Sequence, residues 1–402
     1  MYRKSQKLSL IEGFLYALMV GAGETYLPAY VLSIGMSEVF AGLLVSLPMV
    51  SGAFIQLFTP RLIQQFSSHK HWIVVMVLIQ ALTFIPLIHF TMSESPQFWT
   101  LFFVLTIYWA SGFAAGPVWN YWMGRLIPIQ SGQKFFAFRT RLVQYGTIIG
   151  LVIGGLSLNH RIEILPFASV FTGLFLVAFL ARLLSSFLLS QHSFEKEWQP
   201  SRTLSFAKTI KVFINHPDKR KLFVVLIPFQ CAVFVSAPFV NPYMLAQLKM
   251  DYTHYMLAIA ALFFGKIVSL QIIEKMKSQI SSFGIFKLGL FLIAPMPVCW
   301  AFSHDFYYIV ILQLLSGIFW SLVEYGLSLI FFKDLTDEEK IPVITMYNFL
   351  NALAIIVGTY LGSRVLLKYG EVITSYEMLF VLGGCLRLFA LTPMLFYMNK
   401  NE

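Results

Sequence analysis

Long apolar segments separated by short polar breaks run through almost the whole chain. Each segment is long enough for an α-helix to cross a hydrocarbon layer about 30 Å thick, which takes about 20 residues. Transmembrane β-strands would instead alternate apolar and polar residues over about ten positions, and these segments do not. The pattern therefore predicts an all-α integral membrane protein with twelve transmembrane helices. The predicted helices cover residues 10–34, 39–65, 71–90, 98–125, 134–158, 163–190, 222–247, 252–275, 281–302, 306–333, 341–367 and 374–398.

Composition supports a membrane environment and argues against several kinds of site. Hydrophobic residues make up 58% of the 402 residues and charged residues 12%, whereas soluble domains have about 45–50% and about 25%. The first apolar segment is longer than the core of a signal peptide and no small-residue cleavage site follows it, so we expect it to remain as a helix. Cys231, Cys299 and Cys385 lie in apolar segments without metal-ligand spacing. We therefore expect neither a disulfide framework nor a metal site.

Lysine and arginine are distributed unevenly between the two sides of the predicted membrane. Most lie in the N-terminal segment and in loops on its side, while the opposite loops hold Arg161, Lys249, Arg364 and Lys368. Since cytoplasmic loops retain basic residues, both termini are expected in the cytoplasm. The predicted location is the plasma membrane, which would be the inner membrane in a Gram-negative bacterium. The net charge of +10 then faces anionic lipids, so no nucleic-acid partner is expected.

The longest polar break, residues 191–221, falls almost midway along the chain. It predicts an N-terminal six-helix bundle over 1–190, a cytoplasmic linker over 191–221 and a C-terminal six-helix bundle over 222–402. Apolar residues on one helical face of the linker predict a short amphipathic helix at the membrane interface. An exposed linker helix fits the same spacing equally well.

The two halves match weakly when they are displaced by 213 residues, which pairs Tyr30 with Tyr243 and Gly52 with Gly265. The matches keep chain order and equivalent positions in the helices. Such a pattern predicts two pseudo-symmetric six-helix bundles, related by an axis along the membrane normal.

This topology resembles that of the major facilitator superfamily (MFS) of secondary transporters. Members of that family often carry Gly-x-Leu-Ala-Asp-Arg-x-Gly-Arg-Arg between helices 2 and 3. Here "LIQQFSSHKHW" departs from that form, with Gln64 at the acid's place, Lys70 in the basic pair and Arg61 nearby. The second-half counterpart "IIEKMKSQ" keeps Glu274 and Lys275 at the acid and base places. The resemblance implies the MFS fold and inner gating loops at these five residues.

Two acids lie well away from the ends of predicted helices, Glu24 in the first and Glu324 in the tenth. A carboxylate at the bilayer centre costs at least about 2.5–3.5 kcal/mol, so each should face the bundle interior, be paired, or be protonated. Each could carry a proton across or bind a cationic group of a substrate; a structural ion pair is the alternative. For the embedded bases Arg182, Lys266 and Arg387, we expect structural ion pairs or side chains that reach the interface.

Polar and aromatic residues gather on the fourth and seventh predicted helices. Trp119 and Asn120 follow Pro117 on the fourth, and an amide that faced lipid would leave its donors unpaired. The seventh combines prolines, which free backbone carbonyls, with several polar side chains. We therefore place the first and seventh helices along a central path.

Two asparagines on the eleventh helix, three residues apart, share one face. They could bind a polar solute, or they could form hydrogen bonds that join neighbouring helices, and the sequence favours neither role. The predicted pathway for substrate and protons comprises Glu24, Tyr30, Trp119, Asn120, Gln230, Asn241, Tyr243, Glu324, Asn348 and Asn351.

A stripe of glycines lies on one face of the fifth predicted helix, at Gly146, Gly150, Gly154 and Gly155. Small residues at this spacing let another helix backbone approach closely. We expect this stripe to serve helix packing.

We expect a secondary transporter that moves a small organic solute by alternating access around a midplane site, with proton coupling as a further expectation. No phosphate-binding Gly-x4-Gly-Lys-Ser/Thr loop occurs, so direct ATP drive within this chain is not expected. No His-Glu-x-x-His or Gly-x-Ser-x-Gly motif occurs either, so the chain is not expected to be an enzyme. The alternatives are a transport-dead membrane sensor or scaffold and a membrane-embedded enzyme. The expected partners are the solute, protons and membrane lipids; no cofactor is expected, and the protein should be a monomer. The 40 Phe, 18 Tyr and 8 Trp suit an amphipathic or aromatic solute, while import or export stays open.

Overall fold

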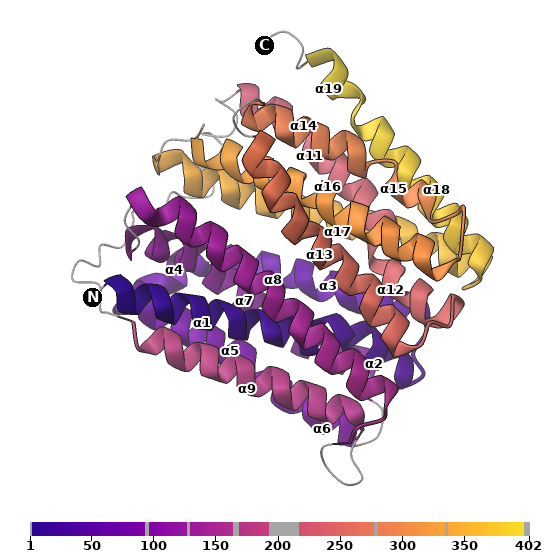
Figure 1. Cartoon of the computed structure of the whole chain (residues 1–402), viewed down its shortest axis with the longest axis horizontal. Helices are drawn as coiled ribbons and strands as arrows, with labels where there is room; N and C mark the ends of the chain where they lie inside the picture. Colours follow the sequence, from indigo (N-terminus) through magenta and orange to yellow (C-terminus); the bar gives the residue numbers. More distant parts are fainter. Residues whose placement is uncertain are drawn as a thin grey trace. The chain divides into compact units, whose positions relative to one another are not determined.

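The computed structural model describes residues 2–92, 96–126, 129–163, 169–192, 217–276, 280–333 and 337–397. Within these ranges the regular elements are all helices, as Figure 1 shows. Eleven helical segments are long and apolar enough to cross a membrane. A twelfth apolar segment consists of α1, η1 and α2, and α1 starts with polar turns that lower its hydropathy. Most of the linker predicted at 191–221 lies outside the described residues.

Contacts divide the chain into two compact units, and some residues at the start of α3 and of α13 belong to the unit of the other half. Unit 1 holds the described residues of Met1–Met36, Leu47–Thr203 and Asp251–Met256. Its helices are α1 (Tyr2–Ala22), η1 (Glu24–Tyr26), α2 (Leu27–Ser33), the second part of α3 (Glu38–Gln56), α4 (Thr59–Leu62), η2 (Ile63–Gln65), α5 (His69–Leu82), α6 (Phe84–Met92), α7 (Phe98–Leu126), α8 (Ile129–Asn159) and α9 (Val170–Ser190). In this unit α1 packs against α8 and α9, and α5 packs against α7 and α9 (Figure 1).

Unit 2 holds the described residues of Ser37–Ser46, Leu204–Met250 and Leu257–Glu402. Its helices are the first part of α3, α11 (Pro217–Ser236), η3 (Ala237–Phe239), α12 (Val240–Pro242), η4 (Tyr243–Gln247), most of α13 (Tyr252–Met276), α14 (Ser282–Ile293), α15 (Met296–Cys299), α16 (Phe306–Lys333), α17 (Asp337–Tyr369), α18 (Ile373–Ala390) and α19 (Thr392–Tyr397). Here α11 packs against α17 and α18, and α14 packs against α16.

The observed helices follow the predicted segments, and two of the differences at their starts have a local explanation. The first helix begins at Tyr2 instead of residue 10, because the polar N-terminal residues continue the same helix. The sixth begins at Val170 instead of residue 163, because Ser169 caps it by accepting a hydrogen bond from the Phe171 amide.

The first and seventh transmembrane segments are both interrupted by a short 3₁₀ turn. In the first segment the turn is Glu24–Tyr26, and in the seventh it is Ala237–Phe239. The displacement of 213 residues that matches Tyr30 with Tyr243 brings these two turns into register. The interruption is therefore a shared feature of the two halves.

Side chains on the outer surface of each unit are large and apolar. Phe103 and Phe187 of unit 1 are 61% and 59% exposed, and Tyr307 and Phe389 of unit 2 are both 74% exposed. Exposed apolar side chains of this size are unfavourable in water but suit contact with lipid chains.

Gly146 and Gly150 of the glycine stripe lie against the backbone of α1, and Gly154 lies against the ring of Tyr26. A Cβ built on Gly150 would come within 2.6 Å of the Leu18 carbonyl oxygen and 2.7 Å of the Ala22 amide nitrogen. The predicted packing role of this stripe is thus what the structure shows.

A larger side chain at Gly150 should force α1 and α8 apart. We expect Gly150→Leu to lower the melting temperature of the detergent-solubilised protein by several degrees, since overpacking costs typically about 1–3 kcal/mol. The control is Gly116→Leu, because outside the adjacent residues and backbone of its own helix no described atom lies within 4 Å of a Cβ built there. Equal melting temperatures of the two variants would contradict this account of the packing.

Candidate functional site

The 3₁₀ turn in the first segment carries Glu24 into the interior of unit 1. The Tyr108 hydroxyl on α7 donates a hydrogen bond to Glu24 Oε2 at 2.5 Å. Beside it, Thr25 Oγ1 donates to the Val20 carbonyl at 3.0 Å, which partly replaces the helical bond lost at the turn. Among the described residues no base lies within ion-pair distance of Glu24, so its carboxyl group is held by a neutral hydroxyl.

Arg182 on α9 lies deeper in the same interior and is 5% exposed. Its Nε and Nη2 donate to Gln80 Oε1 at 2.8 and 2.5 Å, and its Nη1 donates to Ser185 Oγ at 3.1 Å. The guanidinium also stands over the ring of Tyr16, 4.7 Å from its centroid. Arg182 is therefore buried and does not reach the membrane interface. It also forms no ion pair with any described residue, so neither of the two expectations for it holds.

A further set of polar groups, around Glu12, lies nearer the start of α1 than Glu24 does. Glu12 accepts a hydrogen bond from Arg139 Nη2 on α8 at 3.0 Å, and its other oxygen lies 3.4 Å from Ser185 Oγ. The Arg139 guanidinium stands over the ring of Trp119 at 4.1 Å. Ser185 therefore links the Glu12–Arg139 ion pair to Arg182.

We call these groups the unit 1 polar cluster: Glu12, Tyr16, Glu24, Gln80, Tyr108, Arg139, Arg182 and Ser185. Glu12 and Glu24 are twelve residues apart, so the cluster extends about 18 Å along α1 at 1.5 Å per residue. Buried ionic groups are costly unless paired or hydrogen-bonded, and each member with a charge has such a partner. Only the Glu12–Arg139 contact is an ion pair within the described part of this cluster.

In unit 2 a buried arginine donates hydrogen bonds to residues just before the break of the seventh segment. Arg387 on α18 is 5% exposed, and its Nη2 donates to the Val233 carbonyl and Ser236 Oγ, both at 3.3 Å. Like Arg182, it does not extend to the interface. The predicted site residue Asn241 lies in α12, directly after this break.

Tyr243, also predicted in the pathway, is fully buried in an aromatic cluster. Its ring lies 5.1 Å from that of Tyr376 and 5.0 Å from that of Phe380. Its hydroxyl has no hydrogen-bond partner within the described part of the chain. Tyr30 in unit 1 is similar: its ring packs on Phe171 and Phe175, and its hydroxyl has no described partner.

The predicted polar residues of the seventh and eleventh segments come from two helices that pack together, α11 and α17. Gln230 hydrogen-bonds Tyr347, which precedes Asn348. Asn348 is partly buried, and one turn further along α17 the buried Oδ1 of Asn351 has no described hydrogen-bond partner. This face of α11 and α17 therefore holds a buried acceptor without a hydrogen-bond partner among the described residues.

Glu324 forms the ion pair that the sequence allowed as an alternative to a transport role. Its Oε1 lies 2.7 Å from Lys266 Nζ, and the side chains are 58% and 19% exposed. This ion pair joins α13 to α16. Asn120 on α7 is exposed, and the structure gives it no bond within the described residues.

The predicted gating residues are only partly described. Lys70 Nζ donates to the Ser190 and His192 carbonyls at 3.0 and 3.1 Å, which caps the end of α9. Gln64 is exposed. The side chains of Arg61, Glu274 and Lys275 lie outside the described residues, so their gating role stays a prediction.

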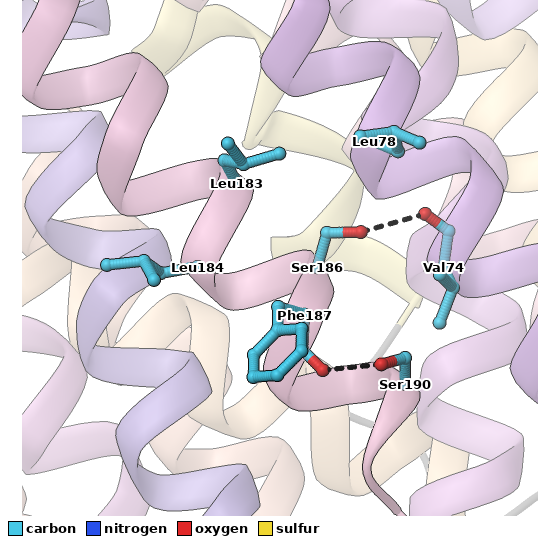
Figure 2. A pocket seen from close by; sticks show the side chains of 7 residues that line it. All are labelled: Val74, Leu78, Leu183, Leu184, Ser186, Phe187 and Ser190. Atoms are coloured by element: carbon cyan, nitrogen blue, oxygen red, sulfur yellow. Dashed lines mark hydrogen bonds between the residues drawn. The ribbon is translucent and has the colours of Figure 1, made fainter.

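A shallow apolar groove lies on the surface of unit 1 between α5 and α9 (Figure 2). Ser186 and Ser190 turn their hydroxyls to the backbone carbonyls of Val74 and Phe187, at 3.1 and 2.7 Å. The exposed Leu184 and Phe187 line it, so it suits lipid chains and offers no polar chemistry. No cluster of potential metal ligands occurs in the described part of the chain.

Several members of the unit 1 polar cluster were not predicted from the sequence. Glu12 precedes the apolar core of its segment, and Tyr16 and Tyr108 read as ordinary membrane aromatics. Gln80 offered a signal, because an amide inside an apolar helix needs a partner. Its bond to Arg182 could not be predicted, because that bond depends on the packing of α5 on α9.

Comparison with known proteins agrees with this architecture. The family model of the Major Facilitator Superfamily matches residues 10–359 of the chain. A variant of the nucleoside transporter NupG has a similar structure, with a TM-score of 0.72 at 14% identity, covering 98% of this chain and 100% of that one. The MFS transporter FucP in its outward conformation gives a TM-score of 0.65 at 16% identity, covering 96% and 98%. A structure of the E. coli fucose:proton symporter FucP gives 0.65 at 15% identity, covering 97% and 99%. No curated protein matches the sequence significantly.

Helices of membrane-spanning length with apolar outer surfaces and a polar interior define a multi-pass membrane protein. Since the family model spans most of its length, the chain belongs to the major facilitator superfamily. The resemblance in the sequence is thereby confirmed. The protein is a transporter with the twelve-helix MFS fold of two six-helix bundles.

Breaking one side of the Glu12–Arg139 pair should be worse than removing both. Arg139→Gln leaves the Glu12 carboxylate, whose side chain is 5% exposed, without its cation, and loss of one partner of a buried pair costs about 3–5 kcal/mol. Adding Glu12→Gln should recover part of the lost melting temperature of the detergent-solubilised protein. Additive losses in the double variant would show that the pair is not coupled.

Acid should destabilise the protein in part through His192. Burial, followed by the charge of Lys70, lowers the pKa of His192 to about 4 from 6.5. The unfolded chain therefore binds this proton first, and stability is lost as pH falls from about 6.5 towards about 4. Between about pH 7 and about pH 5, the melting temperature should fall less in His192→Phe than in the unmodified protein. Parallel falls would contradict the assignment.

Proposed function

We propose that the protein moves a small organic solute by alternating access and binds a coupling proton at Glu24. The observation that carries this proposal is the 2.5 Å hydrogen bond between the Tyr108 hydroxyl and Glu24, in the break of the first segment. Interrupted segments at equivalent positions of two halves are where transporters of this kind form their sites.

A proton-binding acid must exist in both charged and neutral forms during the cycle. An acid in a tight ion pair resists protonation, whereas a carboxyl group bonded to a hydroxyl can be a carboxylate acceptor or a neutral acid. Glu24 has such a partner, while Glu12 and Glu324 are paired with Arg139 and Lys266. Glu24 is therefore the better candidate of the three.

The proposed solute is neutral and carries several hydrogen-bonding groups. Gln230, Asn348 and Asn351 supply uncharged donors and acceptors on adjoining helices, and the buried Asn351 Oδ1 has no described partner. The similar structures are those of a nucleoside transporter and a fucose:proton symporter. Both solute classes fit an uncharged polar site with aromatic surroundings.

Several predictions about organisation belong to this proposal. They are the halves at 1–190 and 222–402 with a linker at 191–221, cytoplasmic termini, a plasma-membrane location and a monomeric state. The gating role of Arg61, Gln64, Lys70, Glu274 and Lys275 is part of it as well.

The test begins with a thermal-shift screen of nucleosides and hexoses, since a ligand of the folded state raises its stability. A solute that shifts the melting temperature is then followed into proteoliposomes with an imposed pH gradient. We expect uptake to follow the gradient, and Glu24→Gln to lose this dependence while retaining exchange of solute across the membrane. The matched control is Glu163→Gln at an exposed acid, which should behave like the unmodified protein.

Gradient-dependent uptake by Glu24→Gln would contradict proton binding at Glu24. Uptake that ignores the gradient in the unmodified protein would contradict proton coupling altogether. Absence of any solute movement would favour the alternative of a transport-dead sensor.

A further inference from the structure

The start of α3 is held by residues far away in the sequence. The Glu371 carboxylate accepts hydrogen bonds from the Val39 amide at 2.9 Å and from the Glu38 amide at 3.2 Å. The first amides of a helix lack partners within the helix and favour a nearby negative charge. Glu371, in the short loop between α17 and α18, thus caps a helix more than 330 residues before it.

The Glu38 side chain is bound in the same place. Its Oε2 accepts a hydrogen bond from the Tyr376 hydroxyl at 2.6 Å, and its Oε1 accepts one from Gln247 Nε2 at 2.7 Å. Gln247 Nε2 also donates to the Glu371 carbonyl at 2.7 Å. We call Glu38, Gln247, Glu371 and Tyr376 the α3 clamp; all four belong to unit 2.

Close packing extends the clamp along α3. A Cβ built on Gly42 would lie 2.5 Å from the ring of Phe239, which is fully buried in the break of the seventh segment. One turn further on, Ser46 is fully buried and its Oγ donates to the Gly42 carbonyl at 3.1 Å. Residues 37–46 are therefore built into unit 2, while α3 from Leu47 onward belongs to unit 1.

The equivalent helix of the second half, α13, is capped by a residue close to it in the sequence. Asp251, which the displacement of 213 residues pairs with Glu38, caps α13 locally by accepting from the His254 amide at 2.8 Å. At the start of α3 the local bond of this kind, from the Phe40 amide to Ser37 Oγ, is longer at 3.3 Å. Among the described residues, the distant cap is found at α3 and not at α13.

From this difference we propose that the α3 clamp is a releasable lock that holds the start of α3 in one conformation of the transporter and opens in the other. Because α3 belongs to both units, movement of one unit against the other must either bend α3 or separate its start from the clamp. The clamp consists of polar groups next to loops, which water can satisfy after release at little cost. The opening step rests on the proposed alternating access, whereas the holding step does not.

The holding step can be tested with a cysteine at the protected end of α3. Ser46→Cys, made with Cys231, Cys299 and Cys385 replaced by serine, is treated with a sulfonated maleimide in membrane fragments open to both sides. While the clamp holds, the thiol is buried and reacts slowly. Glu371→Gln removes the charge but keeps the shape, and should raise the labelling rate about tenfold or more, as expected for loss of a charge-assisted hydrogen bond.

The matched control is Glu377→Gln, an acid on the same helix as Tyr376 that pairs with His304 at 2.9 Å. It should leave the labelling rate unchanged. Tyr376→Phe should raise the rate, which gives a second variant should Glu371→Gln fold poorly. Amide hydrogen exchange of the start of α3 should rise in the same variants.

Equal labelling rates for Glu371→Gln, Tyr376→Phe and the parent would overturn the proposal. Bending of α3 at Pro48, the proline inside that helix, would then accommodate any movement of the units. Faster labelling combined with gradient-independent uptake would instead contradict proton coupling alone.

Discussion

The hydrocarbon core offers no water, so every polar group within it must find its partner in the protein. This constraint explains where the charged side chains of this chain lie. Glu12 and Arg139 pair with each other, Arg182 bonds Gln80 and Ser185, and Glu24 bonds the Tyr108 hydroxyl. Only the last arrangement lets a group gain or lose a proton without stranding a buried opposite charge, which is why the proposed coupling is assigned to it.

The same constraint accounts for the breaks in the first and seventh segments. A broken helix leaves carbonyls without amide partners, and side chains donate hydrogen bonds to these carbonyls instead. Thr25 Oγ1 donates to the Val20 carbonyl, and Arg387 donates to the Val233 carbonyl. Breaks that recur at equivalent places in both halves provide irregular backbone, and discontinuous helices of this kind form the substrate sites of many transporters. The α3 clamp satisfies a helix end in the same manner, but with groups near loops that water can replace.

Much of the fold could be predicted from the sequence, because the length and hydropathy of a single stretch of chain decide whether it can span a membrane. The twelve apolar segments, the glycine stripe of α8 and the choice of Glu24 as a candidate site residue came from such local patterns. Partners across helices could not be predicted. Arg182 and Arg387 were expected to pair or to reach the interface, yet each bonds neutral groups inside its unit. Tyr108 and Glu12 carried no local signal, since their roles depend on which helices pack together.

The central claim is that Glu24 binds a proton inside the bundle, and infrared difference spectroscopy of the protein in lipid tests it most directly. Acidification should produce a protonated-carboxyl carbonyl band that is missing in Glu24→Gln and retained in Glu163→Gln. A band that persists unchanged in Glu24→Gln would contradict the claim, because the titrating acid would then be another residue.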